Sequence, residues 1–318
     1  MHLLSLPLCF SLAMESPTKT PTFSLQNSFL CLFFFFSQYL VVPVTADFNV
    51  TSYYPTDDIT IDCGSSTNAH SLDERSWVGD GNGKFSPIEP ENNKNKSSAA
   101  KAVSPPPSSV GNVPYSTARL SYSQFTYSIP LTSGPKFIRL HFYPTSYLSF
   151  DDPSKKAFFF VQAGPFTLLR NFNASLHAVP KVPLIKEFCT NVEGQRLNLI
   201  FTPSPDITDS YAFINAIEVV SMPTNLYYTP ESDEGVPFLG QAQGSLYTVG
   251  NNTALEMLYR VNVGGREILP GDDTGMFRSW LTDDAYLTIA KPSVFLLISV
   301  FISPSAVYHR TLLRGMFI

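Results

Sequence analysis

Four pairs of adjacent aspartates are the side chains of this sequence whose chemistry could serve catalysis. Two carboxylates placed on either side of a glycosidic bond can hydrolyse it, one as general acid and the other as base or nucleophile. Each pair, however, lies in a turn-like segment, where solvated loop carboxylates are the ordinary explanation. We therefore predict no glycosidase site at these pairs, which are Asp57–Asp58, Asp151–Asp152, Asp272–Asp273 and Asp283–Asp284.

A glycine-rich stretch, Gly79 to Lys84, has the composition of a phosphate-binding or cation-binding loop. Its glycine spacing does not fit a phosphate loop, and Phe85 follows the lysine where Ser or Thr is required. It also lacks the glycine and the final acidic residue of a calcium loop. The histidines are scattered without metal-ligand spacing, and no Gly-x-Ser-x-Gly motif occurs. The sequence thus predicts a hairpin turn at this stretch, and no enzyme activity, catalytic residue, metal site or cofactor.

Alternating apolar residues predict that β-strands form the framework of the chain. Ile138, Leu140 and Phe142 form an apolar face, whereas Arg139 and His141 between them form a polar one. Strand-like segments about ten residues apart, separated by Pro, Gly, Asn and Ser, indicate an all-β sandwich or barrel. The same period of two recurs at Phe125–Ile129, Leu197–Phe201 and Phe213–Val219.

Two parts of the chain share one pattern. Ile59–Gly64 is an alternating segment that ends in Gly and is followed by Arg75–Asp80, which begins Arg-Ser-Trp and ends in Asp. Tyr259–Gly264 and Arg278–Asp283 repeat this order and nearly this spacing. Internal repeats of this kind indicate a duplicated domain. We therefore expect one complete domain followed by the start of a second, with Trp77 as a core anchor of the first.

The repeat sets the expected domain bounds. Residues 47–223 would form the first domain, with an exposed loop at 86–113, and the Pro-containing and acidic segment 224–250 would be a linker. Residues 251–287 would be the truncated start of the second domain, and 288–318 a divergent apolar tail. The run Val294–Ile302 in this tail is shorter than the ~20 apolar residues that span a bilayer. It is instead an uncharged segment prone to β-aggregation.

The amino-terminal residues predict secretion. An apolar run from Phe29 to Val42 ends at Val44-Thr45-Ala46, a small-residue cleavage pattern, and Lys19 precedes it. We expect residues 1–46 to be a signal peptide region, and the mature protein to be secreted or to lie at the extracellular face of the plasma membrane. A retained anchor or a buried strand is the alternative. The net charge of -5 offers no footprint for nucleic acid.

Two kinds of modification fit an extracellular chain. Cys63 and Cys189 remain after signal removal and could form one disulfide, although two separate buried thiols are an equal alternative. Four Asn-x-Ser/Thr sequons predict glycosylated positions on the surface. They are Asn49, Asn95, Asn173 and Asn251.

Five motifs together resemble the malectin-like ectodomain of plant receptor-like kinases of the FERONIA group. The resemblance runs in order from about Tyr54 to Tyr286 and ends after about Leu287. It implies a jelly-roll-like malectin β-sandwich, and a family in which two such domains precede a membrane helix and a kinase that this chain lacks. The motifs are Val113–Arg119, Phe142–Pro144, Ile185–Phe188, Tyr211–Val219 and Asp273–Trp280.

The resemblance implies a recognition function without catalysis. The expected partners are cell-wall polysaccharide (pectin), rapid alkalinization factor peptides and a GPI-anchored co-receptor. Aromatic rings stack on sugars, so the candidates for ligand contact are tyrosines beside Pro-containing turns or in the linker, with ordinary packing as the alternative. A secreted structural or decoy fragment that engages a receptor partner, or a non-functional truncated product, is the rival interpretation. The candidate residues are Tyr143, Tyr147, Tyr227 and Tyr228.

Overall fold

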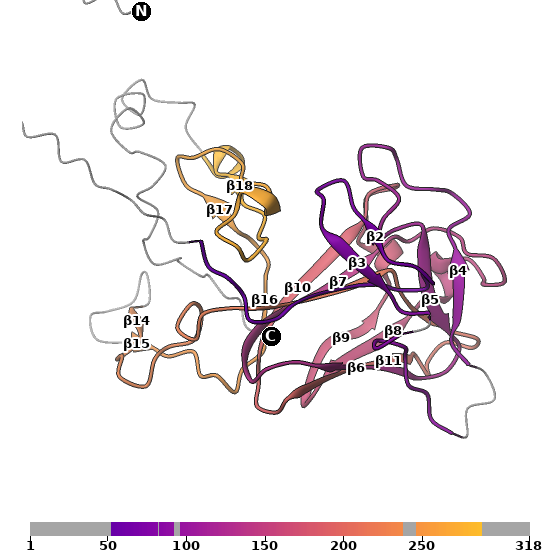
Figure 1. Cartoon of the computed structure of the whole chain (residues 1–318), viewed down its shortest axis with the longest axis horizontal. Helices are drawn as coiled ribbons and strands as arrows, with labels where there is room; N and C mark the ends of the chain where they lie inside the picture. Colours follow the sequence, from indigo (N-terminus) through magenta and orange to yellow (C-terminus); the bar gives the residue numbers. More distant parts are fainter. Residues whose placement is uncertain (1–51, 82, 92–95, 238–245, 288–318) are drawn as a thin grey trace, which may run out of the picture. The chain divides into compact units, whose positions relative to one another are not determined.

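The computed structural model describes residues 52–287 except 82, 92–95 and 238–245 (Figure 1). The regular secondary structure of these residues is almost entirely β-strand, as predicted. The largest sheet has seven strands in the order β16-β10-β7-β13-β1-β3-β2. Its strands are β16 (Leu255–Glu256), β10 (Leu184–Val192), β7 (Gly134–Phe142), β13 (Ala216–Ser221), β1 (Asp58–Asp62), β3 (Ser76–Gly79) and β2 (Ala69–His70).

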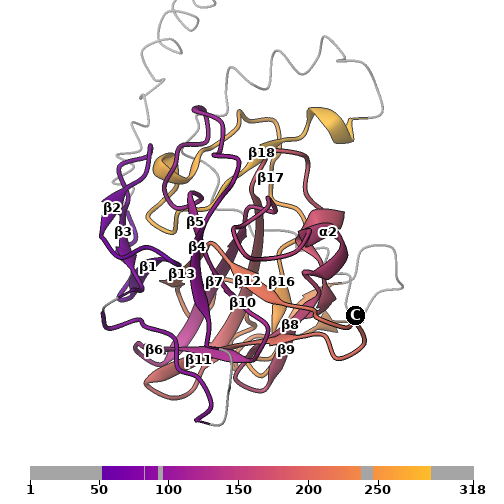
Figure 2. The same ribbon diagram turned by 90° about the vertical axis from the view of Figure 1, so that its right-hand side faces the viewer.

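A second sheet packs against one face of the first to form the sandwich (Figures 1 and 2). It has four strands in the order β6-β11-β8-β9, and a three-stranded sheet, β12-β5-β4, adjoins the same core. The strands are β6 (Phe125–Pro130), β11 (Arg196–Pro203), β8 (Phe159–Ala163), β9 (Phe166–Phe172), β12 (Ala212–Ile214), β5 (Thr117–Ser121) and β4 (Ser98–Lys101).

Short elements complete the described residues. The one α-helical turn among them, α2 (Pro153–Lys156), begins at Asp152, whose carboxylate accepts a hydrogen bond from the Ser154 N–H. The remaining elements are η1 (Ala174–Leu176), β14 (Val236–Pro237), β15 (Leu246–Tyr247), β17 (Val261–Asn262), η2 (Pro270–Asp272), β18 (Leu281–Thr282) and η3 (Asp284–Tyr286).

The central strand β7 has the two faces that the sequence predicts. Ile138, Leu140 and Phe142 are fully buried in the core between the sheets, where Phe142 contacts Phe159 of the second sheet at 5.8 Å between ring centroids. Arg139 lies on the opposite face and is also buried. A strand covered on both sides needs a second layer over its outer face, and later parts of the chain supply it.

The duplicated pattern has the same geometry in both copies. β1 and β3 pair in parallel with Ile61 opposite Val78, and β17 and β18 pair in parallel with Val261 opposite Leu281. The Gly64 N–H donates to Asp80 Oδ1 at 2.8 Å, just as the Gly264 N–H donates to Asp283 Oδ2 at 3.1 Å. Both glycines have positive φ, which favours glycine at this turn. The repeat seen in the sequence is therefore a structural repeat.

Trp77 is buried, as expected, with 3% of its surface exposed. Its indole N–H donates to Ser71 Oγ at 2.9 Å, and its ring meets the edge of His141 at 5.6 Å. In the other copy Trp280 is half-buried between the guanidinium groups of Arg260 and Arg278. The two tryptophans occupy equivalent positions but different environments.

The segment predicted to be a linker differs from that expectation in its first part. Tyr227 and Tyr228, within the predicted linker, are buried against the outer face of the seven-stranded sheet. β16, within the predicted start of the second domain, extends that same sheet by pairing with β10. Part of the predicted exposed loop 86–113 likewise forms β4, which pairs with β5. The bounds 47–223, 224–250 and 251–287 remain predictions, while residues 1–46 and 288–318 lie outside the described residues.

The possible disulfide is absent from this structure. Cys63 and Cys189 are both free and buried. Cys189 lies in β10 and Cys63 follows β1, three strands away in the sheet order. At ~4.8 Å per strand this separation is about 14 Å, well beyond the ~7 Å Cα limit for a disulfide. In this structure the two cysteines are separate buried thiols.

Candidate functional site

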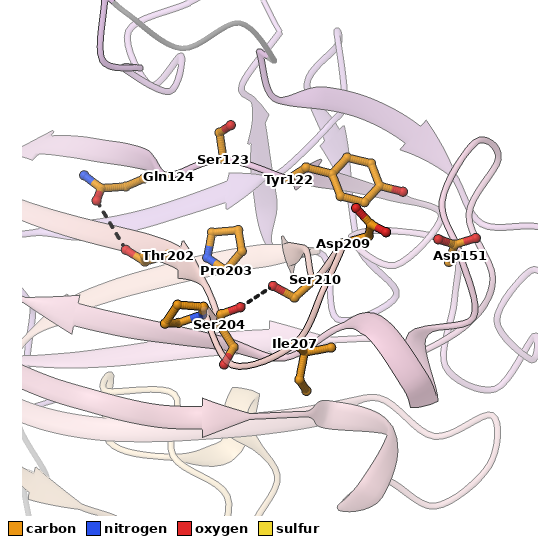
Figure 3. Close-up of a pocket in the computed structure, with 11 residues that line it drawn as sticks. Tyr122, Ser123, Gln124, Asp151, Thr202, Pro203, Ser204, Ile207, Asp209 and Ser210 are labelled. Carbon is orange, nitrogen blue, oxygen red and sulfur yellow. Dashed lines mark hydrogen bonds between the residues drawn. The ribbon is translucent and has the colours of Figure 1, made fainter.

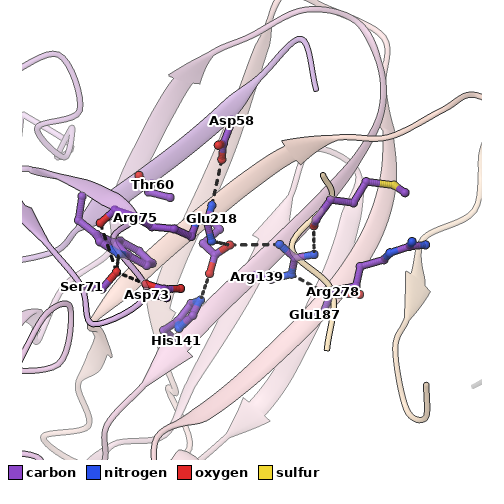
Figure 4. Close-up of polar contacts among 12 residues, drawn as sticks. Asp58, Thr60, Ser71, Asp73, Arg75, Arg139, His141, Glu187, Glu218 and Arg278 are labelled. Atoms are coloured by element: carbon purple, nitrogen blue, oxygen red, sulfur yellow. Dashed lines mark hydrogen bonds and ion pairs between the residues drawn. The ribbon is translucent and has the colours of Figure 1, made fainter. Parts of the chain in front are cut away.

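Opposite charges meet in a row across the outer face of the seven-stranded sheet. The strand register places Glu187 of β10 and Glu218 of β13 directly opposite Arg139 of β7, one on each side. Arg139 Nε donates to Glu187 Oε2 at 2.6 Å, and its Nη1 donates to Glu218 Oε2 at 3.1 Å. One guanidinium thus holds two carboxylates from neighbouring strands (Figure 4).

The row continues in both directions into a balanced ionic network. Arg75 bonds Glu218 Oε2 at 2.6 Å and Asp58 at 2.9 Å, so it joins β13 to β1 and to the loop before β3. Arg260 bonds the other oxygen of Glu187. Three guanidinium groups therefore face three carboxylates. We call these six residues the ionic network: Arg75, Arg139, Arg260, Asp58, Glu187 and Glu218.

The network ties the second repeat to the first domain. Arg139 Nη2 donates to the Met276 carbonyl oxygen at 2.8 Å, and the Arg75 guanidinium lies 4.1 Å from the centroid of the Phe277 ring. An apolar cluster that includes Phe137, Tyr227 and Met276 packs beside these contacts. Buried charge and buried apolar surface together fix the position of residues 274–278 on the sheet.

Neighbouring cations keep the two buried carboxylates of the network ionised. Burial alone would raise the pKa of Glu218, but the hydrogen bond from His141 and the charge of Arg139 hold that pKa well below its usual value. Burial likewise opposes ionisation of Glu187, and Arg139 and Arg260 lower its pKa. His141 is fixed between Glu218 Oε1 at 2.7 Å and the Tyr115 hydroxyl at 2.8 Å. The arrangement positions segments, and it offers no free nucleophile or base.

A second buried acidic group, Asp80, directly follows β3. Asp80 accepts hydrogen bonds from Arg119 Nη2 at 2.7 Å and from the Tyr127 hydroxyl at 2.6 Å. Its neighbour Asp62 has no cationic partner among the described residues. Burial raises the pKa of Asp62 to about 7, with a contribution from Asp80, while the Thr117 hydroxyl opposes the rise.

A polar pocket of about 680 Å³ opens beside the loop 203–210 (Figure 3). Tyr122 forms one side of it, is 36% exposed, and is braced by stacking on Phe150 at 5.0 Å. Asp151 and Asp209 are exposed on the same rim, as Figure 3 shows, and no basic side chain lines the pocket. A rigid aromatic ring beside carboxylates and hydroxyls is a suitable surface for a saccharide.

None of the four tyrosines predicted to contact ligand presents a ring face to solvent in this structure. The Tyr147 hydroxyl donates to the Tyr143 carbonyl oxygen at 2.8 Å, and the Tyr143 hydroxyl lies 3.3 Å from the Pro105 carbonyl oxygen. Tyr227 lies in the apolar cluster over the sheet, and the Tyr228 hydroxyl lies 2.9 Å from the Thr253 carbonyl oxygen. Backbone acceptors satisfy the hydroxyls of Tyr143, Tyr147 and Tyr228, so these rings can pack internally.

The predicted glycosylation positions differ in their exposure to solvent. Asn251 is exposed. Asn173 is buried, and its amide donates to the Pro153 and Ser154 carbonyl oxygens while its oxygen accepts from the Ser175 N–H. The structure thus contradicts the surface position expected for Asn173, because its amide is committed within the fold. Asn49 and Asn95 lie outside the described residues.

At least one aspartate in three of the four pairs has a structural partner. Asp57 accepts from Thr132, and Asp58 pairs with Arg75. Asp273 pairs with Arg278 at 2.8 Å, and Asp283 caps the Gly264 turn. Within the described ranges, no group of three or more His, Cys, Asp or Glu side chains could hold a metal ion.

A sequence profile described as the malectin-like domain matches residues 61–308, which is more than half of the chain. The chain belongs to the malectin-like domain family. It is 41% identical over 251 residues to the receptor-like protein kinase FERONIA of Arabidopsis thaliana, covering 78% of this chain and 27% of FERONIA. The match therefore spans only about a quarter of FERONIA's length.

Solved ectodomains have the same fold. The structure of the plant peptide RALF23 in complex with FER and LLG2 matches at 40% identity and a TM-score of 0.61, covering 75% of this chain and 56% of that chain. The ANX2 ectodomain of Arabidopsis thaliana matches at 32% identity and a TM-score of 0.61, and the match covers 74% of this chain and 56% of that chain. No helix among the described residues of this chain is long and apolar enough to cross a membrane.

Sequence reasoning missed the ionic network and the pocket at Tyr122. Arg139 and His141 were recognisable as the polar face of a strand, and Glu187 and Glu218 fall within the family motifs. A single sequence does not show that these residues lie opposite one another on neighbouring strands of the sheet. Tyr122 stands in no motif, and its exposed ring is evident only from the packing of Phe150 behind it.

Proposed function

We propose that this malectin-like chain is an extracellular recognition module that binds a secreted signalling peptide together with a GPI-anchored co-receptor. The observation that carries the proposal is the 40% identity with FER over most of this chain, because FER was solved in complex with RALF23 and LLG2. Rapid alkalinization factor peptides are accordingly the proposed peptide class. We propose that the mature chain is secreted or lies at the extracellular face of the plasma membrane.

The architecture is consistent with recognition rather than catalysis. The ionic network and the apolar cluster with Phe137 hold residues 274–278 against the first domain. A binding surface that spans both repeats would then be pre-organised, so little ordering entropy would be lost on binding. In this interpretation the network positions the segments, and exposed side chains elsewhere contact the partners.

A binding experiment tests this function directly. The secreted chain is immobilised and exposed to a rapid alkalinization factor peptide, to the soluble co-receptor, and to both together. The proposal expects retention of the peptide that increases when the co-receptor is present. If the co-receptor alone is retained, the rival function of a decoy that engages a receptor partner is correct. If neither is retained by correctly folded protein, both are wrong.

A second candidate function, saccharide binding, rests on the pocket at Tyr122. Its exposed ring and the hydroxyls around it suit a sugar, but Asp151 and Asp209 would repel a polymer of uronic acids. We therefore propose that neutral cell-wall saccharide binds this pocket more tightly than the galacturonate backbone of pectin.

Binding to immobilised polysaccharides separates these ligands. Tyr122→Ala is expected to weaken retention on neutral oligosaccharide at least tenfold, by loss of the stacking surface. Tyr286→Ala, which removes an exposed ring elsewhere, is the matched control. Equal retention of Tyr122→Ala and its parent would exclude the pocket, and tighter binding to polygalacturonate would contradict the charge argument.

A further inference from the structure

The pocket at Tyr122 continues onto the outer face of the four-stranded sheet. Gln124 and Thr202 line the pocket, and they also lie at the pocket end of β6 and β11. The Thr202 hydroxyl donates to Gln124 Oε1 at 3.4 Å, so the two side chains lie on the same face of the sheet, as Figure 3 shows. The pocket is therefore one end of a larger surface.

The strand register defines the part of this surface that lies beyond the pocket. Thr126 of β6 lies opposite Ile200 of β11, which lies opposite Gln162 of β8 on its other side. Two residues further along, Ser128 lies opposite Asn198. The residues between them on each strand are buried in the core, so these five side chains face outward. We call the five residues the outer strip.

The outer strip carries amides, hydroxyls and one aliphatic side chain, and none of its five residues is charged. Ser128 Oγ donates to Asn198 Oδ1 at 2.7 Å, which fixes this pair. The Gln162 side-chain amide is exposed and has no hydrogen bond within the described part of the chain. Soluble surfaces ordinarily include charged side chains. A strip of neutral donors and acceptors complements a neutral, polyhydroxylated ligand better than a charged one.

The outer strip also has the size and the boundaries of an extended site. Asn198 is four residues from Thr202 along β11, which is about 14 Å at ~3.4 Å per residue. Half-buried Phe160, opposite Thr202, provides an aromatic ring at the pocket end. At the far end, Arg196 Nη1 donates to Ser128 Oγ at 3.1 Å. A ligand of one or two sugar rings would fill the pocket alone, whereas a longer chain would reach the strip.

We propose that the pocket at Tyr122 and the outer strip together bind one neutral, linear glycan chain that runs along β11. The proposal rests on saccharide binding at the pocket and specifies its ligand. Tyr122 stacks on a sugar ring at one end of the chain, and the amides of Gln162 and Asn198 bond hydroxyls of the following rings. Because the pocket rim carries Asp151 and the strip carries no cation, a neutral chain is preferred to a polyanionic one.

Calorimetric titration of the secreted full chain with neutral glycans of two lengths tests the proposal. The probes are the dimer and the hexamer of β-1,4-linked glucose and of β-1,4-linked mannose. At least one hexamer is expected to bind at least tenfold more tightly than its dimer. Gln162→Ala should weaken binding of that hexamer about fivefold, through loss of one hydrogen bond, and leave the dimer unchanged. Tyr122→Ala should weaken both lengths.

Asn252→Ala, which removes an exposed amide outside the outer strip, is the matched control and should change neither affinity. Since Gln162 is itself exposed, its replacement is not expected to unfold the sheet. A loss of affinity for the hexamer alone is a result that a general structural defect would not produce, because such a defect would weaken the dimer as well.

Each other outcome overturns the proposal. If a dimer binds as tightly as its hexamer and Tyr122→Ala weakens both, the pocket binds saccharide and the outer strip takes no part. If Tyr122→Ala leaves hexamer binding unchanged, the strip and the pocket are not one site. If no probe binds correctly folded protein, the saccharide function of the pocket is wrong as well. Binding of an uncharged peptide rich in Ser and Asn in place of the glycans would assign the strip to an extended peptide.

Discussion

Arg139 Nη2 donates a hydrogen bond to the carbonyl oxygen of Met276 at 2.8 Å. Arg139 is in the middle of the central strand β7, and Met276 lies shortly before the second Arg-Ser-Trp motif. The remaining donors of the same guanidinium hold Glu187 and Glu218. One buried side chain therefore joins three strands of the large sheet to the second repeat, just before its Arg-Ser-Trp motif.

Arg139→Met should destabilise the protein by about 3–5 kcal/mol, because removing one partner of a buried ionic cluster leaves charge without compensation. Urea unfolding of parent and variant measures the loss. Lys155→Met is the matched control, since Lys155 forms an exposed pair with Asp152 and should change stability by less than about 0.5 kcal/mol. An unchanged unfolding midpoint for Arg139→Met would show that the network contributes no net stability.

The sequence predicts the faces of β7 but not its partners. Alternation assigns Ile138 and Leu140 to the core and Arg139 to the other face, because the side-chain period of a strand is two. The meeting of Arg139 with Glu187 and Glu218 depends on the register of strands far apart in sequence, which alternation does not specify. The burial of the four candidate tyrosines could not be predicted for a related reason. A ring beside a proline turn can pack inward when a backbone carbonyl accepts its hydroxyl, as at Tyr147.

Trp77→Ala should destabilise the first domain by ~3–5 kcal/mol, the usual cost of removing a large buried ring. The ring contacts His141, which is hydrogen-bonded to Glu218, so loss of the ring also removes packing from this hydrogen-bonded pair. Trp280→Ala provides a comparison within the repeat and should cost less, because Trp280 is half-buried. Thermal unfolding of both variants measures this. A Trp77→Ala protein that melts like the parent would contradict the core role.

Asp62 should make stability decrease as pH rises from about 4 to 7. In the unfolded chain its pKa is ~3.9, whereas burial and Asp80 raise the folded pKa to about 7. Between these values the folded state binds the extra proton, so each rise in pH favours unfolding, and the effect levels off above about 7.

Asp62→Asn should remove this dependence, and the second copy already has Asn262 at the equivalent position. Relative to the parent, the variant should gain more than about 1 kcal/mol between pH 4.5 and pH 8, given ~1.4 kcal/mol per pKa unit. Urea unfolding at both pH values measures it. The variant Asp206→Asn, at an exposed loop position, controls for the change in net charge. Parallel pH profiles for Asp62→Asn and parent would refute the assignment.

Asn251 and Asn173 should differ in glycan occupancy. Asn251→Gln should lower the mass of the secreted protein by one glycan, since Asn251 is exposed. Asn173→Gln should leave the mass unchanged and destabilise the fold by about 1–3 kcal/mol, because a longer side chain cannot keep the bonds to Pro153 and Ser175. Intact-mass measurement after secretion, with glycosidase treatment, distinguishes the two. A glycan found on Asn173 would contradict its buried position.

A chain that ends at Pro223 should be less stable and less soluble than one that ends at Leu287. The sequence alone favours Pro223 as a boundary, because the strands of the first sandwich end there. The structure shows in addition that side chains from residues 224–287 cover part of the outer face of the seven-stranded sheet. Without residues 224–287, Phe137 and Val220 would lose the cover of Tyr227 and Met276. The exposed apolar patch would favour self-association.

The ionic network also predicts that the chain ending at Pro223 is the less stable one. Glu187 would lose Arg260, and Arg139 would lose its carbonyl acceptor, so buried polar groups would be left partly unpaired. Residues 47–223 and 47–287 can be compared by light scattering and urea unfolding. The longer chain is expected to be monomeric with the higher midpoint. If 47–223 is monomeric and unfolds at the same urea concentration, the outer layer is dispensable, and the first domain is complete at Pro223 after all.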